Sequence, residues 1–337
     1  MKELIQKLTQ VSSPSGREVE IRNVILDEVK NFVDGYEIDK LGNLIVWKKG
    51  RSNEKLLLDA HMDEIGVVAT YIDEKGFIRI EGIGGISPYN LLGSTISFPN
   101  NIKGVIGVEG ETQEELTKNM RELNFDKIFV DIGVKDKESA EKLVPPGTFG
   151  VYYAPFIDLG ERVISKAMDD RIGCAIIIEV LKRSKPYHNL YATFTVQEEM
   201  GLVGASTVAF NIKPDMAIAV DVTLHSDTPK GNKRMSLNLG SGPAIKIKDS
   251  VSISDRKVVE KLRNLAEKKN IPYQIEVLLR GGTNAAALQT TGEGIISGTL
   301  SIPTRYVHSP HEMVDLNDVE NAVKLLTFLV EEEEKLL

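Results

Sequence analysis

The chain has 337 residues, of which 42% are hydrophobic and 27% charged, an ordinary globular composition that excludes a disordered or fibrous protein. Its net charge is −8 and no basic stripe stands out, so no nucleic-acid partner is expected. Apolar runs such as 174–178 and 216–220 are far shorter than a membrane span, so no membrane partner is expected either. A single cysteine, and an N-terminus without the apolar segment of a secretory signal, predict a cytoplasmic protein.

The N-terminal region predicts two helices. Apolar residues recur at helical spacing over 4–11, and a break rich in Ser, Pro and Gly follows at 12–16. Ser15 and Glu18 have the spacing of a capping box, which would start a second helix with an apolar stripe over 21–32.

The sequence pattern changes between residue 67 and residue 160. It predicts short strands separated by Gly and Pro, with one helix over 112–123. The predicted strands are 67–72, 77–80, 95–98, 105–108 and 127–132. The pattern indicates a small β-rich domain, 67–160, inserted into a larger domain formed by 1–66 and 161–337.

The larger domain alternates strands with helices. Its predicted strands are 44–47, 55–60, 190–196, 216–220, 274–279 and 294–300. Its predicted later helices are 169–184, 203–210, 254–269 and 316–333. This alternation predicts an α/β fold with a mostly parallel sheet between helical layers.

Polar residues follow the apolar strands of this sheet. His61, Glu198 with Glu199, and Asp221 each come directly after such a strand, and His308 follows another. Ligands of open α/β sheets bind beyond the carboxyl ends of the strands, so these side chains are expected at one edge.

Each of these residues alone has an ordinary interpretation, as a surface histidine, a solvated turn or, for the pair that starts with Asp169, a charge at a helix N-terminus. Together they would bury several acids, which is costly without counter-charges. A pair of divalent cations removes that cost, and imidazole with carboxylate suits Zn²⁺, Co²⁺ or Mn²⁺.

The segments around these residues resemble the tetrahedral aminopeptidases of the glutamyl and leucyl type. These are co-catalytic dizinc metallopeptidases whose members are sometimes labelled endoglucanases. The matching segments run in the family's order and cover essentially the whole chain. They are AHMDEIG at 60–66, KAMDDRIG at 166–173, VQEEMGLVGA at 196–205, Asp221-Val222, GGTNA at 281–285 and RYVHSP at 305–310.

The resemblance implies a role for each matching residue. Asp169 would bridge two divalent ions, Zn²⁺ or Co²⁺. His61 and Asp221 would complete one ion site, and Glu199 and His308 the other. Glu198 would be the general base for attack by a metal hydroxide, and Asp63 would orient the His61 ring.

The resemblance also implies the substrate and the assembly. The substrates would be peptides with a free N-terminus. The 67–160 insert would form dimers, and the dimers would assemble into a hollow tetrahedral dodecamer.

Some alternatives stay open. The family usually has Asp where this chain has Asn284, His311 competes with His308 as a ligand, and Arg280 would lie either on the surface or in a pocket for an acidic side chain. Another co-catalytic metallohydrolase, such as a carboxypeptidase or an N-acyl amino-acid deacylase, is the nearest rival function. More distant rivals are a glycosidase that pairs Glu198 with Asp221, and an inactive scaffold or assembly protein.

Overall fold

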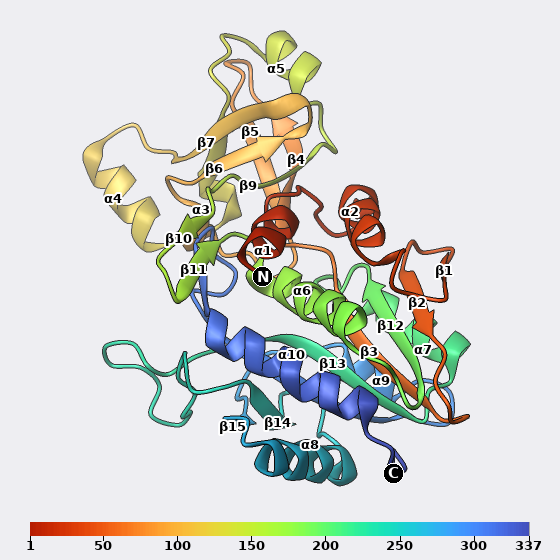
Figure 1. Cartoon of the computed structure of the whole chain (residues 1–337). Helices are drawn as coiled ribbons and strands as arrows, with labels where there is room; N and C mark the ends of the chain where they lie inside the picture. The colour runs from red at the N-terminus through yellow and green to blue at the C-terminus, as the bar shows by residue number, and fades with distance from the viewer. Residues whose placement is uncertain (337) are drawn as a thin grey trace.

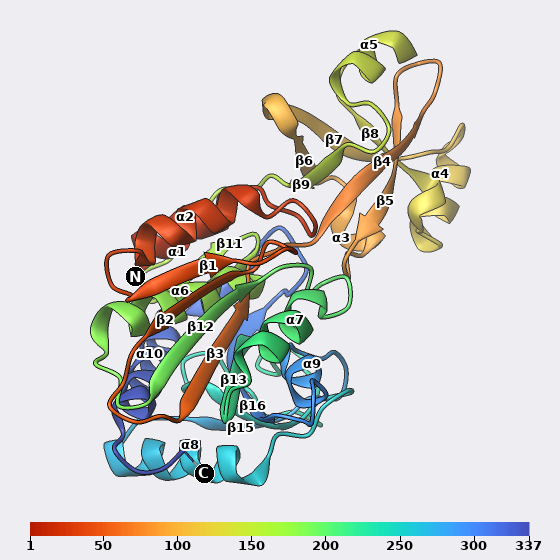
Figure 2. The ribbon, with the colours of Figure 1, turned by 90° about the vertical axis from the view of Figure 1, so that its right-hand side faces the viewer.

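The computed structural model describes residues 1–336 and comprises a large sheet covered by helices and a smaller β-barrel. The barrel projects from one end of the larger body, and the chain enters and leaves it through neighbouring strands (Figure 1, Figure 2). Within residues 1–336, no helix has the length and apolar character needed to cross a membrane.

The 11-stranded sheet has a parallel centre and antiparallel margins. Four neighbouring strands are parallel: β12 (Asn189–Thr195), β3 (Lys55–His61), β13 (Met216–Thr223) and β16 (Ile296–Arg305). The antiparallel margins are β2 (Leu44–Lys48) and β1 (Gly35–Ile38) beyond β12, and β17 (Glu312–Asp315), β11 (Arg162–Ser165) and β10 (Ile157–Asp158) beyond β16. A further pair, β14 (Ala244–Lys248) and β15 (Gln274–Val277), is attached through β16.

Helices cover both faces of this sheet. The core on one face packs α1 (Lys2–Thr9), α2 (Val19–Val29), α6 (Met168–Arg183), α8 (Arg256–Lys269) and α10 (Leu316–Glu331). The core on the other face packs α7 (Val203–Ile212) and α9 (Ala285–Gln289). Along β3, Leu56 and Leu58 belong to the first core and Leu57 to the second, because successive side chains point to opposite faces. The predicted α/β class is confirmed.

The barrel closes six strands around its own apolar core, which includes Ile72, Ile78 and Ile96. In spatial order they are β4 (Gly66–Ile72), β5 (Ile78–Ile83), β8 (Ile128–Asp131), β7 (Ile102–Val108), β6 (Thr95–Phe98) and β9 (Phe149–Tyr152). Its helices are α3 (Pro88–Leu91), α4 (Gln113–Arg121) and α5 (Lys137–Leu143), with 3₁₀ turns η1 (Pro99–Asn101) and η2 (Phe125–Lys127). The prediction of only one helix was therefore wrong.

The division into 1–66 with 161–337 and an inserted 67–160 stays a prediction, and residue 337 lies outside the described residues.

The predicted capping box was also wrong. Helix α2 begins at Val19 with no side-chain cap. Ser15 Oγ instead donates to Asp63 Oδ2 at 2.6 Å, and Glu18 Oε1 accepts the backbone N–H groups of Gly16 and Gln197. Ser15 and Glu18 thus pair with polar groups near the ends of the central strands, where a buried group without a partner is costly, and they do not cap the helix.

Candidate metal centre

Four of the predicted residues reach one edge of the sheet through the register of three parallel strands. His61 is the last residue of β3 and pairs with Thr195, the last residue of β12. The turn after Thr195 therefore brings Glu198 and Glu199 beside His61. Asp221 lies inside β13, because that strand continues to Thr223 beyond its predicted end.

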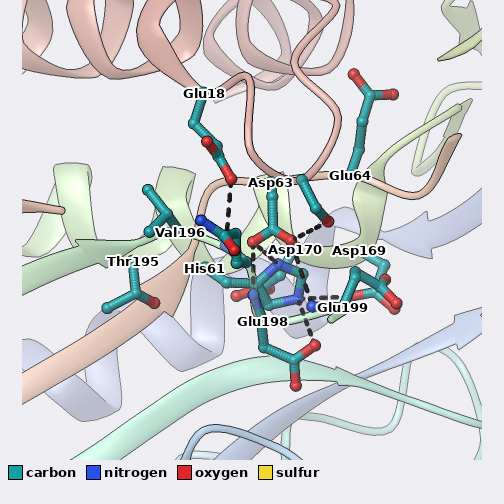
Figure 3. A network of polar contacts seen from close by, with 12 residues as sticks. Glu18, His61, Asp63, Glu64, Asp169, Asp170, Thr195, Val196, Glu198 and Glu199 are labelled. Atoms are coloured by element: carbon teal, nitrogen blue, oxygen red, sulfur yellow. Dashed lines mark hydrogen bonds and ion pairs between the residues drawn. The ribbon is translucent and has the colours of Figure 1, made fainter. Parts of the chain in front are cut away.

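Asp169 lies between two histidines. Its Oδ1 is 3.0 Å from His61 Nε2, and its Oδ2 is 3.2 Å from His308 Nε2. The same His308 nitrogen is 3.0 Å from Glu199 Oε1. Asp169 has non-helical φ and ψ although it falls at the start of α6, so the helix-dipole interpretation does not describe it. Figure 3 shows the His61 ring between Asp63 and the carboxylates of Asp169 and Glu198.

Asp170 is a member of this cluster that the sequence did not single out. Ligand atoms of His61, Asp170 and Asp221 lie within 4.8 Å of one another. Asp170 is fully buried, and its Oδ2 has no hydrogen-bond partner among the described residues. Its place beside Asp169 in the KAMDDRIG segment is the one signal that could have identified it.

Burial and charge shift the pKa values of the cluster in opposite directions. Burial raises the pKa of Asp221 to about 7, with a further rise from Asp169. Burial also raises the pKa of Glu198 well above its usual value, although His61 opposes the rise. Burial by itself would lower the pKa of His308, but hydrogen bonds to Asp169 and Glu199 outweigh it and raise that pKa to about 12.

These residues fit a divalent metal. The potential ligands are imidazole nitrogens and carboxylate oxygens. They form three overlapping groups of three residues, and within each group the ligand atoms lie close enough together to bind one ion. Without a cation such a cluster must hold protons between its members, and metal binding would release them.

Asp63 contacts several members of the cluster from behind. Its Oδ1 is 3.3 Å from His61 Nδ1 and accepts the backbone N–H of Glu198 at 3.0 Å. Its Oδ2 accepts the backbone N–H of Glu199 at 3.3 Å and the hydroxyl of Ser15 (Figure 3). Asp63 is fully buried, so its orientation is fixed by these contacts.

The structure gives the positions of the two competing histidines and of Asn284. His308 is in the cluster, whereas His311 is exposed and belongs to none of the potential metal-binding groups within residues 1–336. Asn284 is buried behind the cluster, where its amide donates to Asp59 Oδ2 at 2.7 Å and to Thr195 Oγ1 at 2.9 Å.

A cavity of about 650 Å³ opens over the cluster. Its charged lining consists of the predicted metal ligands, Glu198 and Arg280. Arg280 both borders this cavity and is exposed, so both alternatives for it stay open. The apolar lining of the cavity includes Leu224, Val251 and Leu278.

Comparison with known proteins identifies relatives over nearly the full length of the chain. The model of the M42 glutamyl aminopeptidase family matches residues 42–325. A putative aminopeptidase of Acetivibrio thermocellus is 45% identical and covers 97% of each chain. The lysyl aminopeptidase of Pyrococcus furiosus is 35% identical over 98% of this chain and 96% of its own. The solved structure of the TET1 peptidase of Pyrococcus horikoshii, described as assembling into a tetrahedron or a large octahedral shell, superposes with a TM-score of 0.86 at 35% identity. It covers 98% of this chain and 99% of the TET1 chain.

Proposed function

Because the chain belongs to the M42 glutamyl aminopeptidase family, and is therefore a peptidase, we propose that it removes N-terminal residues from peptides at a two-ion centre with Glu198 as general base. The observation that carries this proposal is the position of Asp169. Its two carboxylate oxygens face Nε2 of two different histidines, His61 and His308, as a ligand shared by two ions requires.

Peptidases of this family depend on metal. We assign Asp169 as the shared ligand, His61 and Asp221 to one ion, and Glu199 and His308 to the other, with Zn²⁺ or Co²⁺ as the metal. When bound, the two ions would activate a water molecule and polarise the scissile carbonyl. Asp170 is close enough to His61 and Asp221 that its negative charge would help to stabilise the ion that they hold.

Glu198 moves the proton in this proposal. Its Oε2 is 4.0 Å from His61 Nε2, at the edge of the cluster and on the cavity side. A carboxylate whose pKa is raised by burial can take a proton from the attacking water and return it to the departing amine. Asp63 fixes the backbone of Glu198, and thereby keeps this carboxylate in reach of the cavity.

The assembly and the location follow as further parts of the proposal. The similarity to a peptidase that forms closed shells supports a dodecamer built from dimers, with residues 67–160 as the dimerisation insert. The protein would act in the cytoplasm on peptides with a free N-terminus.

Metal analysis combined with a substitution of the base tests the proposal. Glu198→Gln keeps the size of the side chain, so the variant is expected to retain two ions per subunit. Its kcat should fall by about 10²–10⁴-fold, the usual contribution of a general base. Full turnover by Glu198→Gln would remove Glu198 from this role.

A substrate panel separates the aminopeptidase from the N-acyl amino-acid deacylase. Aminoacyl-anilides and their N-acetylated forms should be assayed with metal-free, Zn²⁺-loaded and Co²⁺-loaded enzyme. We expect cleavage of the free amines alone, and only in the metal-loaded samples. Preferential cleavage of the N-blocked compounds would support the deacylase instead.

A further inference from the structure

We propose that residues 84–90 of the barrel, which form the loop after β5 and the start of α3, position His308 and Glu199, so that one ion site depends on the inserted segment while the other does not. The inference rests on the proposed function, because it takes both residues as metal ligands. It makes the insert part of the catalytic unit as well as an assembly element.

The first observation is how the His308 ring is held. Its Nδ1 lies 3.0 Å from the carbonyl oxygen of Gly85, a residue of the loop. A carbonyl can only accept a hydrogen bond, so Nδ1 carries the proton and donates. Nε2, which faces Asp169 and Glu199, is then the nitrogen that would exchange its proton for an ion, while Nδ1 keeps its proton as in a metal-ligating histidine.

The second observation concerns the backbone of His308. Its φ of 63° is left-handed, a conformation that is unfavourable for a non-glycine residue and persists only where neighbours enforce it. Asn90 Nδ2, from α3, donates to the His308 carbonyl oxygen at 3.0 Å. On the other side, Glu312 Oε1 accepts the His308 N–H at 2.6 Å.

The third observation is how closely the loop approaches both ligands. A Cβ atom added at Gly85 would lie 2.7 Å from Cε1 and Nδ1 of His308, closer than such atoms pack. A Cβ atom added at Gly84 would lie 3.0 Å from Cβ and Oε2 of Glu199. Only residues without side chains let the loop reach this position.

The remaining ligands have no such support from the insert. The polar contacts of the His61 ring come from Asp63, Asp169 and Glu198, and Asp221 accepts the backbone N–H of Val222. All of these partners lie outside residues 67–160. A change in the loop should therefore reach Glu199 and His308 first.

Metal titration of the full-length protein tests the inference. Metal-free wild type, Gly85→Ala and Asn90→Ala are titrated with Zn²⁺ by calorimetry, with competing chelator where binding is tight. We expect Gly85→Ala to weaken one of the two binding steps by about 10–100-fold and Asn90→Ala by less, the range seen when the support of a ligand is lost. The other step should stay within about twofold of wild type, since its ligands are untouched.

Asn124→Ala is the matched control, because Asn124 is exposed on the same insert and its side chain makes no hydrogen bond to the described residues. It should bind both ions as wild type does. Thermal unfolding of each metal-free variant checks the fold, and if Gly85→Ala does not fold, Asn90→Ala decides alone.

Equal weakening of both steps, or two unchanged steps, would overturn the inference. Failure of the wild type itself to bind two ions would instead overturn the proposed function.

Discussion

Asp63 joins His61 to Glu198 through a single oxygen atom. Oδ1 of Asp63 lies 3.3 Å from the His61 ring and accepts the backbone N–H of Glu198 at 3.0 Å. A residue proposed as a metal ligand and a residue proposed as a base, far apart in the chain, are thus held by one buried carboxylate.

Asp63→Asn should reduce catalysis and weaken metal binding. The amide removes the negative charge that faces the His61 ring and, since NH₂ cannot accept, leaves the Glu199 N–H without its partner. We expect kcat/KM to fall and Zn²⁺ binding to weaken by about 10–100-fold. Steady-state kinetics and metal titration check this. Ser15→Ala, which removes only one outer hydrogen bond of Asp63, is the control and should change both values much less.

The sequence was informative about site residues that lie at the end of a recognisable strand. The apolar runs that became β3, β12 and β13 could be recognised, and parallel pairing brings the residues at their ends together. The resemblance added Asp169, whose position at the start of a helix had an ordinary interpretation.

The sequence was uninformative where two distant segments meet. Gly84 and Gly85 had no predicted role in the site, because nothing local reveals that the insert folds back onto Glu199 and His308. Strand β14 and the buried lysine on it were missed for the same reason, since a charged residue argues against burial until its partners are known.

Lys246 is that buried lysine, and its removal should destabilise the fold. Its Nζ is 3.4 Å from Glu276 Oε1 and 3.7 Å from Asp249 Oδ2, and all three side chains are buried. Lys246→Met keeps the length of the side chain but leaves two carboxylates without a cation. We expect the free energy of unfolding to fall by about 3–5 kcal/mol, as measured by urea denaturation.

Adding Glu276→Gln to Lys246→Met should restore part of this loss, because one of the unpaired charges disappears. A loss below about 1 kcal/mol for the single variant would mean that the lysine is not the cation that balances these acids.

Asp318 should make the free energy of unfolding depend on pH, and a single substitution can isolate this effect. Its oxygens accept the N–H groups of Gly240 and Gly242, but burial raises its pKa to about 6, above the usual value of 3.8. Between these values the folded state binds the proton more tightly than the unfolded state. The stability that the protonated Asp318 carboxyl contributes is therefore fully present below pH 3.8 and is lost as the pH rises through 6.

Asp318→Asn does not titrate, so the free energy of unfolding of wild type minus that of the variant should fall between pH 4 and pH 7. The expected decrease is on the order of 2 kcal/mol, from denaturant melts at several pH values. A difference that increases with pH would show that the two N–H groups outweigh burial and hold the pKa low.

Arg280 should set the charge preference of the cavity. It is exposed, and among residues 1–336 its side chain has no hydrogen bond or ion pair. It is also the one charged residue of the cavity lining that is neither a proposed ligand nor the proposed base. An acidic N-terminal side chain could pair with it, whereas a basic one would be repelled and would find no free carboxylate among the lining residues.

Arg280→Glu should therefore shift the ratio of kcat/KM for glutamyl over lysyl anilides toward lysyl by about 10-fold, since reversing one exposed charge changes each pairing by roughly 0–1 kcal/mol. Leucyl anilide should be cleaved at a nearly unchanged rate, because Leu224, Val251 and Leu278 supply the apolar walls. Arg280→Lys keeps the charge and should keep the preference. If leucyl anilide is cleaved but the ratio does not move in Arg280→Glu, the guanidinium does not reach the substrate and Arg280 has only the surface role.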